Sequence, residues 1–300
     1  DDKEDNAAWS YEVVHVAKIF AERGHQVYML SETDLVDGVF DNIFNGSIKN
    51  NYDRIIIWSG TFNLDKEGED IINKLSHQTS RLDFMLTDLR LVPQDKSLYR
   101  VFDTIYTQAT RAIGGQGIPQ DKQKYGGVAE FLPYKHHYNL SIEESLALKK
   151  TEFYFGGTER GRIMDFLEYC WRPNHVLTTK SAFLKLENRC TRDQYMSLLD
   201  DTQYSIVIAD VDYNENYFIT PRPFEYFIHD IVCFTDNKFD RDGHIIPLDS
   251  WLRVNNYKEM VDKIHELDAD PQKKWEWIQW GRSKITPEIA SGDYVYGLIS

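Results

Sequence analysis

Two short segments carry the residue types that hold a nucleoside diphosphate. The first, Phe153 to Arg162, is a strand pattern that runs into a glycine turn, a hydroxyl and two arginines. Glycine lets backbone N–H groups approach a ligand closely, and arginine pairs well with phosphate oxygens. The candidate phosphate-binding residues are Gly156, Gly157, Thr158, Arg160 and Arg162. An exposed turn followed by ordinary surface arginines is the alternative interpretation.

The second segment, Phe218 to Glu225, places a cation and a carboxylate three residues apart. Pro221 and Pro223 predict the start of a helix, because proline is tolerated in a first helical turn. Arg222 and Glu225 then share one helix face, where Glu225 can take both hydroxyls of a ribose and Arg222 can lie beside the phosphates. An intrahelical salt bridge is the alternative. Together the two segments predict a nucleotide-sugar site, and hence a glycosyltransferase.

The elements that would position these residues alternate between strands and helices. In the first half, strand patterns occur at 26–30, 54–58, 83–86 and 103–106, and helical patterns at 12–23 and 69–75. In the second half, strand patterns occur at 152–155, near 182–185, at 205–209 and at 231–235, with helical patterns at 162–169, 192–199, 222–229 and most of 258–280. The alternation predicts an α/β protein with doubly wound sheets. The simplest architecture that accounts for both halves is two Rossmann-like lobes with a cleft between them.

Composition and charge narrow the class of protein. The 300 residues are 42% hydrophobic and 14% aromatic, as in a packed globular protein. No apolar run of about eighteen residues occurs, and the first residues lack signal-peptide character, so we expect no membrane partner. Three scattered cysteines predict reduced thiols in a cytoplasm. The net charge of −14 weighs against nucleic acid as a partner unless a local basic groove is present.

Several segments, in order and at similar spacing, resemble the DNA beta-glucosyltransferase family of T-even phages. They lie at 52–56, 86–91, 156–162, 213–225, 254–256 and 266–267, and the match runs from Glu12 to about Asp268. The resemblance implies an α/β fold of the GT-B type. It also implies transfer of glucose from UDP-glucose to the hydroxymethyl group of 5-hydroxymethylcytosine in double-stranded DNA, with inversion of the anomeric carbon.

The chain also departs from the family pattern. Tyr217 looks like an extra residue, the first strand and its loop are absent, and the segment after the glycine turn is slightly shorter. An acidic stretch at 65–70 stands where lysine-rich sequence is expected. The donor site is therefore better supported than the acceptor. Lysines such as Lys122, Lys124 and Lys135 are candidates for a local groove.

The resemblance implies a role for further residues. Asp88 follows the strand pattern at 83–86 and matches the catalytic base, which would accept the proton of the attacking hydroxyl. Capping of the next helix, or pairing with Arg90, is the alternative. Glu12 and Asp210 match residues near the transferred sugar, and Tyr213 matches a phosphate contact. A helix-dipole role for Glu12 and a solvated loop around Asp210 remain open. Mg²⁺ is a possible assistant, but the sequence shows no metal-ligand set.

The same resemblance implies how the chain is organised. We expect an N-terminal acceptor-side lobe over 1–148, a C-terminal UDP-sugar-binding lobe over 149–272 and a terminal helical segment over 273–300 that packs back on the N-terminal lobe. We expect a monomer that acts in the cytoplasm of an infected bacterial cell. The donor sugar, hexose or pentose, and the acceptor, hydroxymethylcytosine or an already glycosylated base, stay open. The rival hypotheses are a UDP-sugar enzyme with a non-DNA acceptor and a non-catalytic nucleotide- or DNA-binding module.

Overall fold

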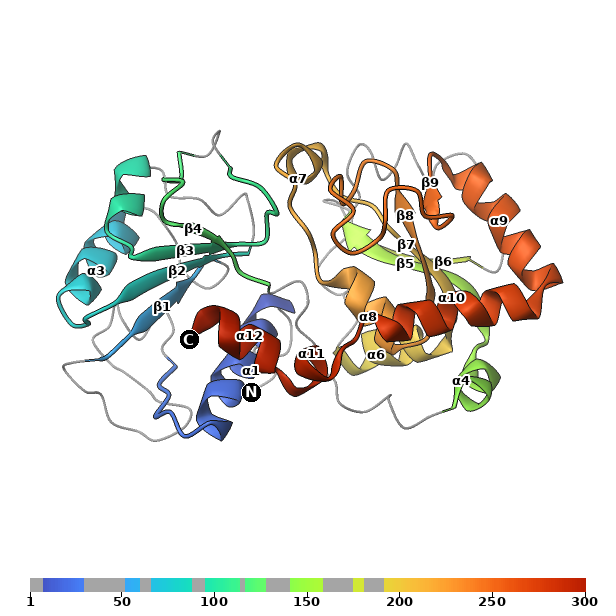
Figure 1. Ribbon diagram of the computed structural model, residues 1–300, viewed down its shortest axis with the longest axis horizontal. Coiled ribbons are helices and arrows are strands. Elements are labelled where there is room, and N and C mark those ends of the chain that lie inside the picture. Colours follow the sequence, from blue (N-terminus) through green and yellow to red (C-terminus); the bar gives the residue numbers. More distant parts are fainter. Residues whose placement is uncertain are drawn as a thin grey trace. The chain divides into compact units, whose positions relative to one another are not determined.

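The computed structural model describes residues 8–29, 52–59, 66–87, 95–113, 117–127, 141–158, 175–180 and 192–300. The chain forms two compact units (Figure 1). The N-terminal unit contains Ala7–Pro133 and Gly292–Ser300, and the C-terminal unit contains Tyr134–Ser291 with Asp1–Asn6. The expected limits at 148 and 272 therefore differ from this division, which groups 134–148 and 273–291 with the C-terminal unit. As limits of functional lobes, they stay a prediction.

A parallel sheet of four strands, in the order β1-β2-β3-β4, forms the centre of the N-terminal unit. Its strands are β1 (Ile55–Trp58), β2 (Leu82–Leu86), β3 (Thr104–Thr107) and β4 (Gln123–Tyr125). The three strands predicted within 54–106 are confirmed. β2 and β3 are buried along their whole length, as expected of parallel strands covered on both faces. β4 escaped prediction because Gln-Lys-Tyr has no apolar run.

The described helices of this unit are α1 (Ala8–Glu22), α3 (Lys66–Ser76), the 3₁₀ turn η2 (Lys96–Arg100) and α12 (Asp293–Ile299). α1 ends before Gly24, whose φ of 86° only glycine adopts easily. The strand predicted at 26–30 is wrong as far as it is described, because residues 25–29 form no ladder. Instead, the Tyr28 ring packs edge-on against Tyr52, with centroids 5.8 Å apart.

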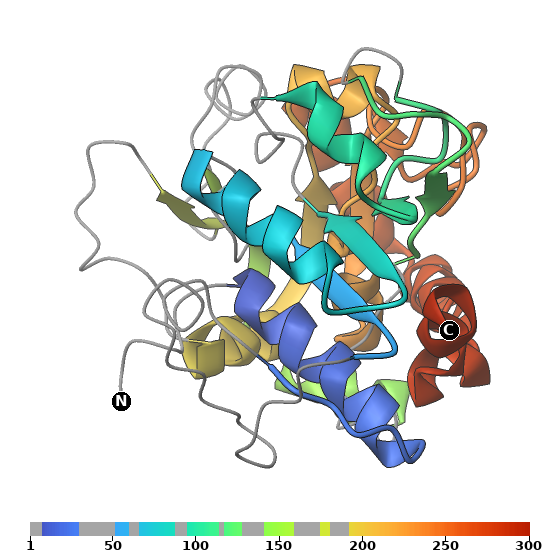
Figure 2. The same cartoon turned by 90° about the vertical axis from the view of Figure 1, so that its left-hand side faces the viewer.

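One face of this sheet is covered by α1 and α12 together. The buried cluster between them draws on both ends of the chain and on three strands: Val16, Ile19, Trp58, Met85, Tyr106, Val295 and Ile299. Gly292 opens α12, and a Cβ there would lie 2.5 Å from Ile19 Cδ1, so the close approach of the two helices requires glycine. In Figure 2, α1 is drawn in blue and α12, which ends at the C-terminus, in red.

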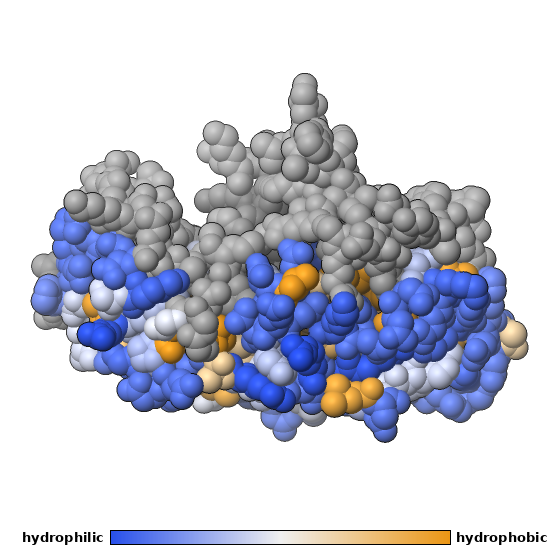
Figure 3. Space-filling model, turned by 90° about the horizontal axis from the view of Figure 1, so that it is seen from above, coloured by the Kyte–Doolittle hydropathy of each residue, from blue (hydrophilic) through white to orange (hydrophobic). Residues whose placement is uncertain are grey.

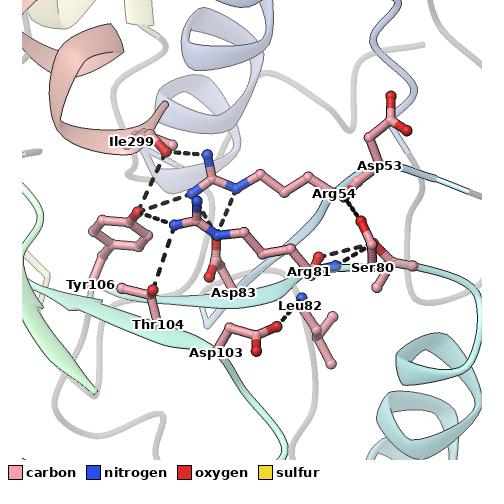
Figure 4. A network of polar contacts seen from close by, with 11 residues as sticks. Asp53, Arg54, Ser80, Arg81, Leu82, Asp83, Asp103, Thr104, Tyr106 and Ile299 are labelled. Atoms are coloured by element: carbon pink, nitrogen blue, oxygen red, sulfur yellow. Dashed lines mark hydrogen bonds and ion pairs between the residues drawn. The ribbon is translucent and has the colours of Figure 1, made fainter. Parts of the chain in front are cut away.

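A polar network ties α12 to the same sheet (Figure 4). Asp83 of β2 is fully buried, and its Oδ2 accepts from Arg54 Nε at 2.6 Å and from Arg81 Nε at 2.9 Å. Both guanidinium groups also donate to the hydroxyl of Tyr106, at 2.9 and 3.0 Å. Arg54 donates in addition to the carbonyl of Ile299, at the C-terminal end of α12, where helix carbonyls need a donor.

The C-terminal unit contains a parallel sheet of five strands in the order β6-β5-β7-β8-β9. Its strands are β5 (Thr151–Thr158), β6 (His175–Lys180), β7 (Thr202–Val207), β8 (Val232–Asp236) and β9 (Arg253–Val254). The strands predicted at 152–155, 205–209 and 231–235 are confirmed, with small shifts of their ends. The strand predicted near 182–185 and the helix predicted at 162–169 lie outside the described residues.

The described helices of this unit are α4 (Ile142–Leu148), α6 (Arg192–Asp201), α7 (Val211–Glu215), α8 (Arg222–Ile228), α9 (Tyr257–Ala269), α10 (Pro271–Ser283) and α11 (Pro287–Ser291). α4 forms just before the expected lobe limit at 148, and Ser141 and Glu144 make a capping box at its start. The helical region at 258–280 divides at Asp270, which caps α10 just before Pro271. α10 packs against α8 and β8, within this unit.

Candidate functional site: the carboxyl edge of the second sheet

The strand order of the C-terminal sheet defines where a ligand can bind. The chain passes from β5 to β6 on one side and then returns to β7 on the other side of β5. In open α/β sheets, this reversal leaves a crevice outside the carboxyl ends of the two neighbouring strands, where ligands bind. At this edge of the sheet lie Gly156–Thr158, at the end of β5, and the segment that follows Val207, the last residue of β7.

The two glycines of this site lie within β5. Gly156 and Gly157 pair in parallel register with Thr178 and Thr179 of β6, so the glycine turn predicted here is wrong. Glycine inside a strand often marks a place where a ligand comes close to the backbone. The expected chemistry, close approach of a phosphate to main-chain groups, is thus compatible with a strand end as well as with a turn.

The segment after β7 is a short, well-fixed helix. Asp210 is the N-cap residue of α7, but its carboxylate makes no capping hydrogen bond to the helix. Asn214 Nδ2 donates to the carbonyl of Ala209 at 3.0 Å, which closes the turn from inside. The Tyr213 ring packs edge-on against Phe218, with centroids 5.0 Å apart. These contacts hold Asp210 and Tyr213 at the carboxyl edge of the sheet.

Helix α8 brings the second predicted segment to the same strand. Pro221 is its N-cap residue and Pro223 lies in its first turn, so the predicted helix start is confirmed. The guanidinium of Arg222 lies over the Phe155 ring, 5.9 Å from its centroid. Phe155 immediately precedes Gly156, so Arg222 stands at the end of β5 that carries the glycines. Glu225 lies in the same first turn of α8.

The structure thus places six of the predicted UDP-binding residues, and Asp210, in one unit. The six are Gly156, Gly157, Thr158, Tyr213, Arg222 and Glu225. Arg160, Arg162 and Asp88 lie outside the described residues. Glu12 lies in α1 of the N-terminal unit, where its backbone is described and its side chain is not. The contacts above relate none of these four to the site.

The residues just before Asp88 are fixed by a serine that sequence reasoning missed. Ser59, buried and directly after β1, accepts from the Thr87 backbone N–H through its Oγ at 3.1 Å. Its own N–H donates to the Met85 carbonyl at 2.9 Å. The signal was present in the sequence, as a serine between a buried apolar strand and Gly60. Ser59 thereby fixes the chain at the end of β2, up to Thr87, the residue before Asp88 in the sequence.

Among the described residues, no three His, Cys, Asp or Glu side chains come together in a way that could hold a metal ion. The carboxylates of Asp210 and Asp212 alone do not make a binding set for a divalent cation. Within the same described part of the chain, every helix is too short or too polar to cross a bilayer. Cys233 is a free, buried thiol.

Comparisons with known proteins identify the fold. No protein-family model matches the chain, and no curated protein matches it by sequence. Among solved structures, T4 phage BGT in complex with UDP and Mn²⁺ aligns with a TM-score of 0.63 and 17% identity, over 98% of this chain and 94% of the other. A mutant of T4 phage BGT in complex with UDP-glucose gives a TM-score of 0.66 and 18% identity, over 98% and 94%.

A third solved structure is that of the DNA-modifying enzyme beta-glucosyltransferase, in the presence and absence of uridine diphosphoglucose. It aligns with a TM-score of 0.61 and 18% identity, over 98% of this chain and 95% of the other. The predicted fold class is confirmed: the chain has the α/β GT-B fold of phage DNA beta-glucosyltransferase. At this level of identity, the likeness establishes the fold alone.

Proposed function

We propose that this chain is a UDP-sugar-dependent DNA glycosyltransferase. The observation that carries the proposal is the contact of Arg222 with Phe155 at the carboxyl end of β5. It brings the ribose- and phosphate-binding candidates of α8 to the glycines of the strand at which the sheet reverses its order. The likeness over nearly the full chain to enzymes solved with UDP and UDP-glucose supports the same assignment.

In the proposed donor complex, Gly156, Gly157 and Thr158 hold the diphosphate through backbone and hydroxyl groups. Tyr213 and Arg222 contact the phosphates from α7 and α8, and Glu225 accepts hydrogen bonds from the ribose hydroxyls. Arg160 and Arg162 join them as cations. Their positive charge stabilises the UDP that leaves, because negative charge develops on the bridging phosphate oxygen during the reaction.

The proposed reaction is a single displacement. Asp88 accepts the proton of the acceptor hydroxyl, and that oxygen forms a bond to the anomeric carbon while the bond from this carbon to the phosphate oxygen breaks. The configuration inverts and UDP departs. Glu12 and Asp210 orient the sugar. Mg²⁺ stays a possible assistant of the reaction, and no step is assigned to it, because the described residues contain no cluster of three metal-ligating side chains.

The proposed acceptor is the hydroxymethyl group of 5-hydroxymethylcytosine, or an already glycosylated base, in double-stranded phage DNA. A base flipped out of the duplex would present that hydroxyl. Glucose is the first expectation for the donor sugar, and a pentose is the alternative. We place the enzyme, as a monomer, in the cytoplasm of an infected bacterium.

Mass analysis of nucleosides tests the proposal. DNA with hydroxymethylcytosine and DNA with plain cytosine are each incubated with the protein and a panel of UDP-sugars. We expect a hexose or pentose mass on the modified DNA alone. Asp88→Asn should abolish the added mass while UDP binding persists, and Asp262→Asn, an exposed acid of α9, should change neither. Folded protein that binds UDP but adds no mass to either DNA would remove hydroxymethylcytosine as the acceptor. The same assay with already glycosylated DNA then separates a glycosylated base from an acceptor that is not DNA.

A further inference from the structure

One contact in the C-terminal unit joins two segments that follow neighbouring strands. α7 and Tyr217 follow β7, and the loop 237–252 follows β8. The guanidinium of Arg241, in this loop, lies over the Tyr217 ring, 4.9 Å from its centroid. Because β7 and β8 are parallel neighbours, both segments leave the same carboxyl edge of the sheet (Figure 1).

Both sides of this contact depend on unusual backbone. Tyr217 has a φ of 54°, and Asp240, immediately before Arg241, has a φ of 48°. Within the described part of the chain, Asp230 is the one other non-glycine residue with positive φ. A bulky residue stays in this region only where its surroundings fix it, and such positions gather at functional sites.

The surroundings do fix both segments. The Asp240 carboxylate accepts the backbone N–H groups of His244, Ile245 and Ile246, at 2.8 to 2.9 Å. The buried Arg253 donates to four carbonyls across the loop, those of Phe239, Asp240, Ile246 and Pro247. On the other side, the Phe218 N–H donates to the Tyr213 carbonyl at 2.9 Å. The backbone segments that carry Tyr217 and Arg241 are therefore fixed by contacts within the unit.

The charge of Arg241 is available at the surface. Arg241 is exposed and Tyr217 is half-buried. Among the described residues, Arg241 has the Tyr217 ring as its partner and no carboxylate, while Asp240 is occupied by loop amides and lies near Arg253. In a chain of net charge −14, such a guanidinium is suited to an anion from outside.

The same two segments also expose apolar side chains. Val211 of α7 is 52% exposed and Leu248 of the loop is 61% exposed, on a described surface that is mainly hydrophilic from above (Figure 3). Leu248 lies against Gly243, two residues from Arg241. Aromatic and arginine side chains beside exposed apolar groups are typical of contacts with macromolecules.

We propose that Val211, Tyr217, Arg241 and Leu248, here called the 217/241 surface, bind the sugar-phosphate backbone of the acceptor DNA. Arg241 contacts a phosphate, and Tyr217 holds the guanidinium in place. The inference rests on the proposed function. It assigns the pair to the acceptor because Arg241 follows β8, one strand beyond the β5/β7 edge where the donor diphosphate would lie.

Binding of hydroxymethylcytosine duplex DNA, measured by fluorescence anisotropy across a salt series, tests the proposal. Arg241→Gln should weaken binding about 3- to 10-fold and lower the slope of log affinity against log salt by about 0.9, the value for one lost phosphate contact. Tyr217→Asn should weaken DNA binding less. Asparagine tolerates the left-handed backbone at this position, and the change removes only the aromatic ring that supports the Arg241 guanidinium. Lys258→Gln, an exposed cation on α9, is the matched control and should leave affinity and slope unchanged. UDP affinity should be unchanged in all three.

The outcomes separate this surface from the function on which it rests. Wild-type protein that binds DNA, together with an unchanged salt slope in Arg241→Gln, would overturn the 217/241 surface alone. A loss of UDP affinity in Arg241→Gln without a loss of DNA affinity would also overturn it. That result would assign Tyr217 and Arg241 to the binding site of the UDP-sugar. Wild-type protein that binds UDP but no DNA at low salt would remove the DNA acceptor, and this surface with it.

Discussion

The guanidinium of Arg222 lies 5.9 Å from the centre of the Phe155 ring, which joins the start of α8 to the last part of β5. Two segments that are separated by more than sixty residues in the sequence are thereby brought to one strand end. Phe155 is fully buried and gives the cation a fixed platform. The planar guanidinium thus lies over the residue that directly precedes Gly156 in β5.

Arg222→Gln should therefore weaken UDP binding about 10- to 100-fold, because a hydrogen bond to a charged group contributes about 1.5–3 kcal/mol. Arg222→Lys should recover part of the affinity, since lysine keeps the charge and loses the planar fork. Isothermal titration with UDP measures both. Arg100→Gln, in η2 of the N-terminal unit, is the control for loss of a surface cation. Equal affinity of Arg222→Gln and the wild type would contradict the assignment.

Glu225 should give the site its preference for ribose. We expect the wild type to bind UDP about 10-fold more tightly than 2′-deoxy-UDP. Without the 2′-hydroxyl, the Glu225 carboxylate loses a hydrogen-bond donor and is left unpaired in the complex. Glu225→Ala should bind both nucleotides with similar affinity. Titration with the two nucleotides measures the ratio, and thermal unfolding checks that α8 is intact. A ratio that survives in the variant would assign Glu225 to another role.

Asp83 should be a major determinant of stability in the N-terminal unit. Asp83→Asn removes the buried charge that Arg54 and Arg81 share, and breaking a buried ion pair typically costs about 3–5 kcal/mol. Urea unfolding measures the loss. Asp262→Asn breaks an exposed pair with Lys258 and should change the unfolding free energy by less than about 1 kcal/mol. Similar small losses in both variants would show that the network contributes little.

Lys149 should make stability depend on alkaline pH. Burial lowers the pKa of its ammonium group to about 8, although Nζ donates to the carbonyls of Leu199 and His229. Between that pH and the ordinary lysine pKa, the unfolded chain holds the proton and the folded chain does not. Stability therefore rises with pH across this window, by up to about 3 kcal/mol.

Lys149→Met should remove that rise, because methionine carries no proton to lose. Urea midpoints at intervals from pH 7 to 10.5 measure the two curves, and their difference isolates Lys149 from the other groups that titrate there. Lys258→Met, at an exposed site of α9, should leave the wild-type slope intact. Parallel curves for the wild type and Lys149→Met would contradict the lowered pKa.

The sequence was informative where apolar runs and prolines determine local structure. The β-branched run at 55–58 is typical of a buried strand, and Pro221 correctly predicted the start of α8. The glycines at 156 and 157 were misread, because their pairing with β6 is a tertiary feature that no local signal carries. Ser59 and Arg241 were missed for the same reason: their partners, Thr87 and Tyr217, are distant in the chain. The order of the strands, which defines the site, also depends on long-range pairing.

The shared core of α1 and α12 affects the order in which the two units of this protein can fold during synthesis. Val295 and Ile299 cover Trp58 and Met85, so the N-terminal unit cannot complete its core from residues 7–133 alone. Chains emerge from the ribosome in sequence order, and N-terminal domains usually fold first. Here the first unit to be synthesised must wait for the whole second unit before its last helix arrives. A nascent chain halted before residue 292 should therefore expose this apolar face to chaperones, with the C-terminal sheet already complete.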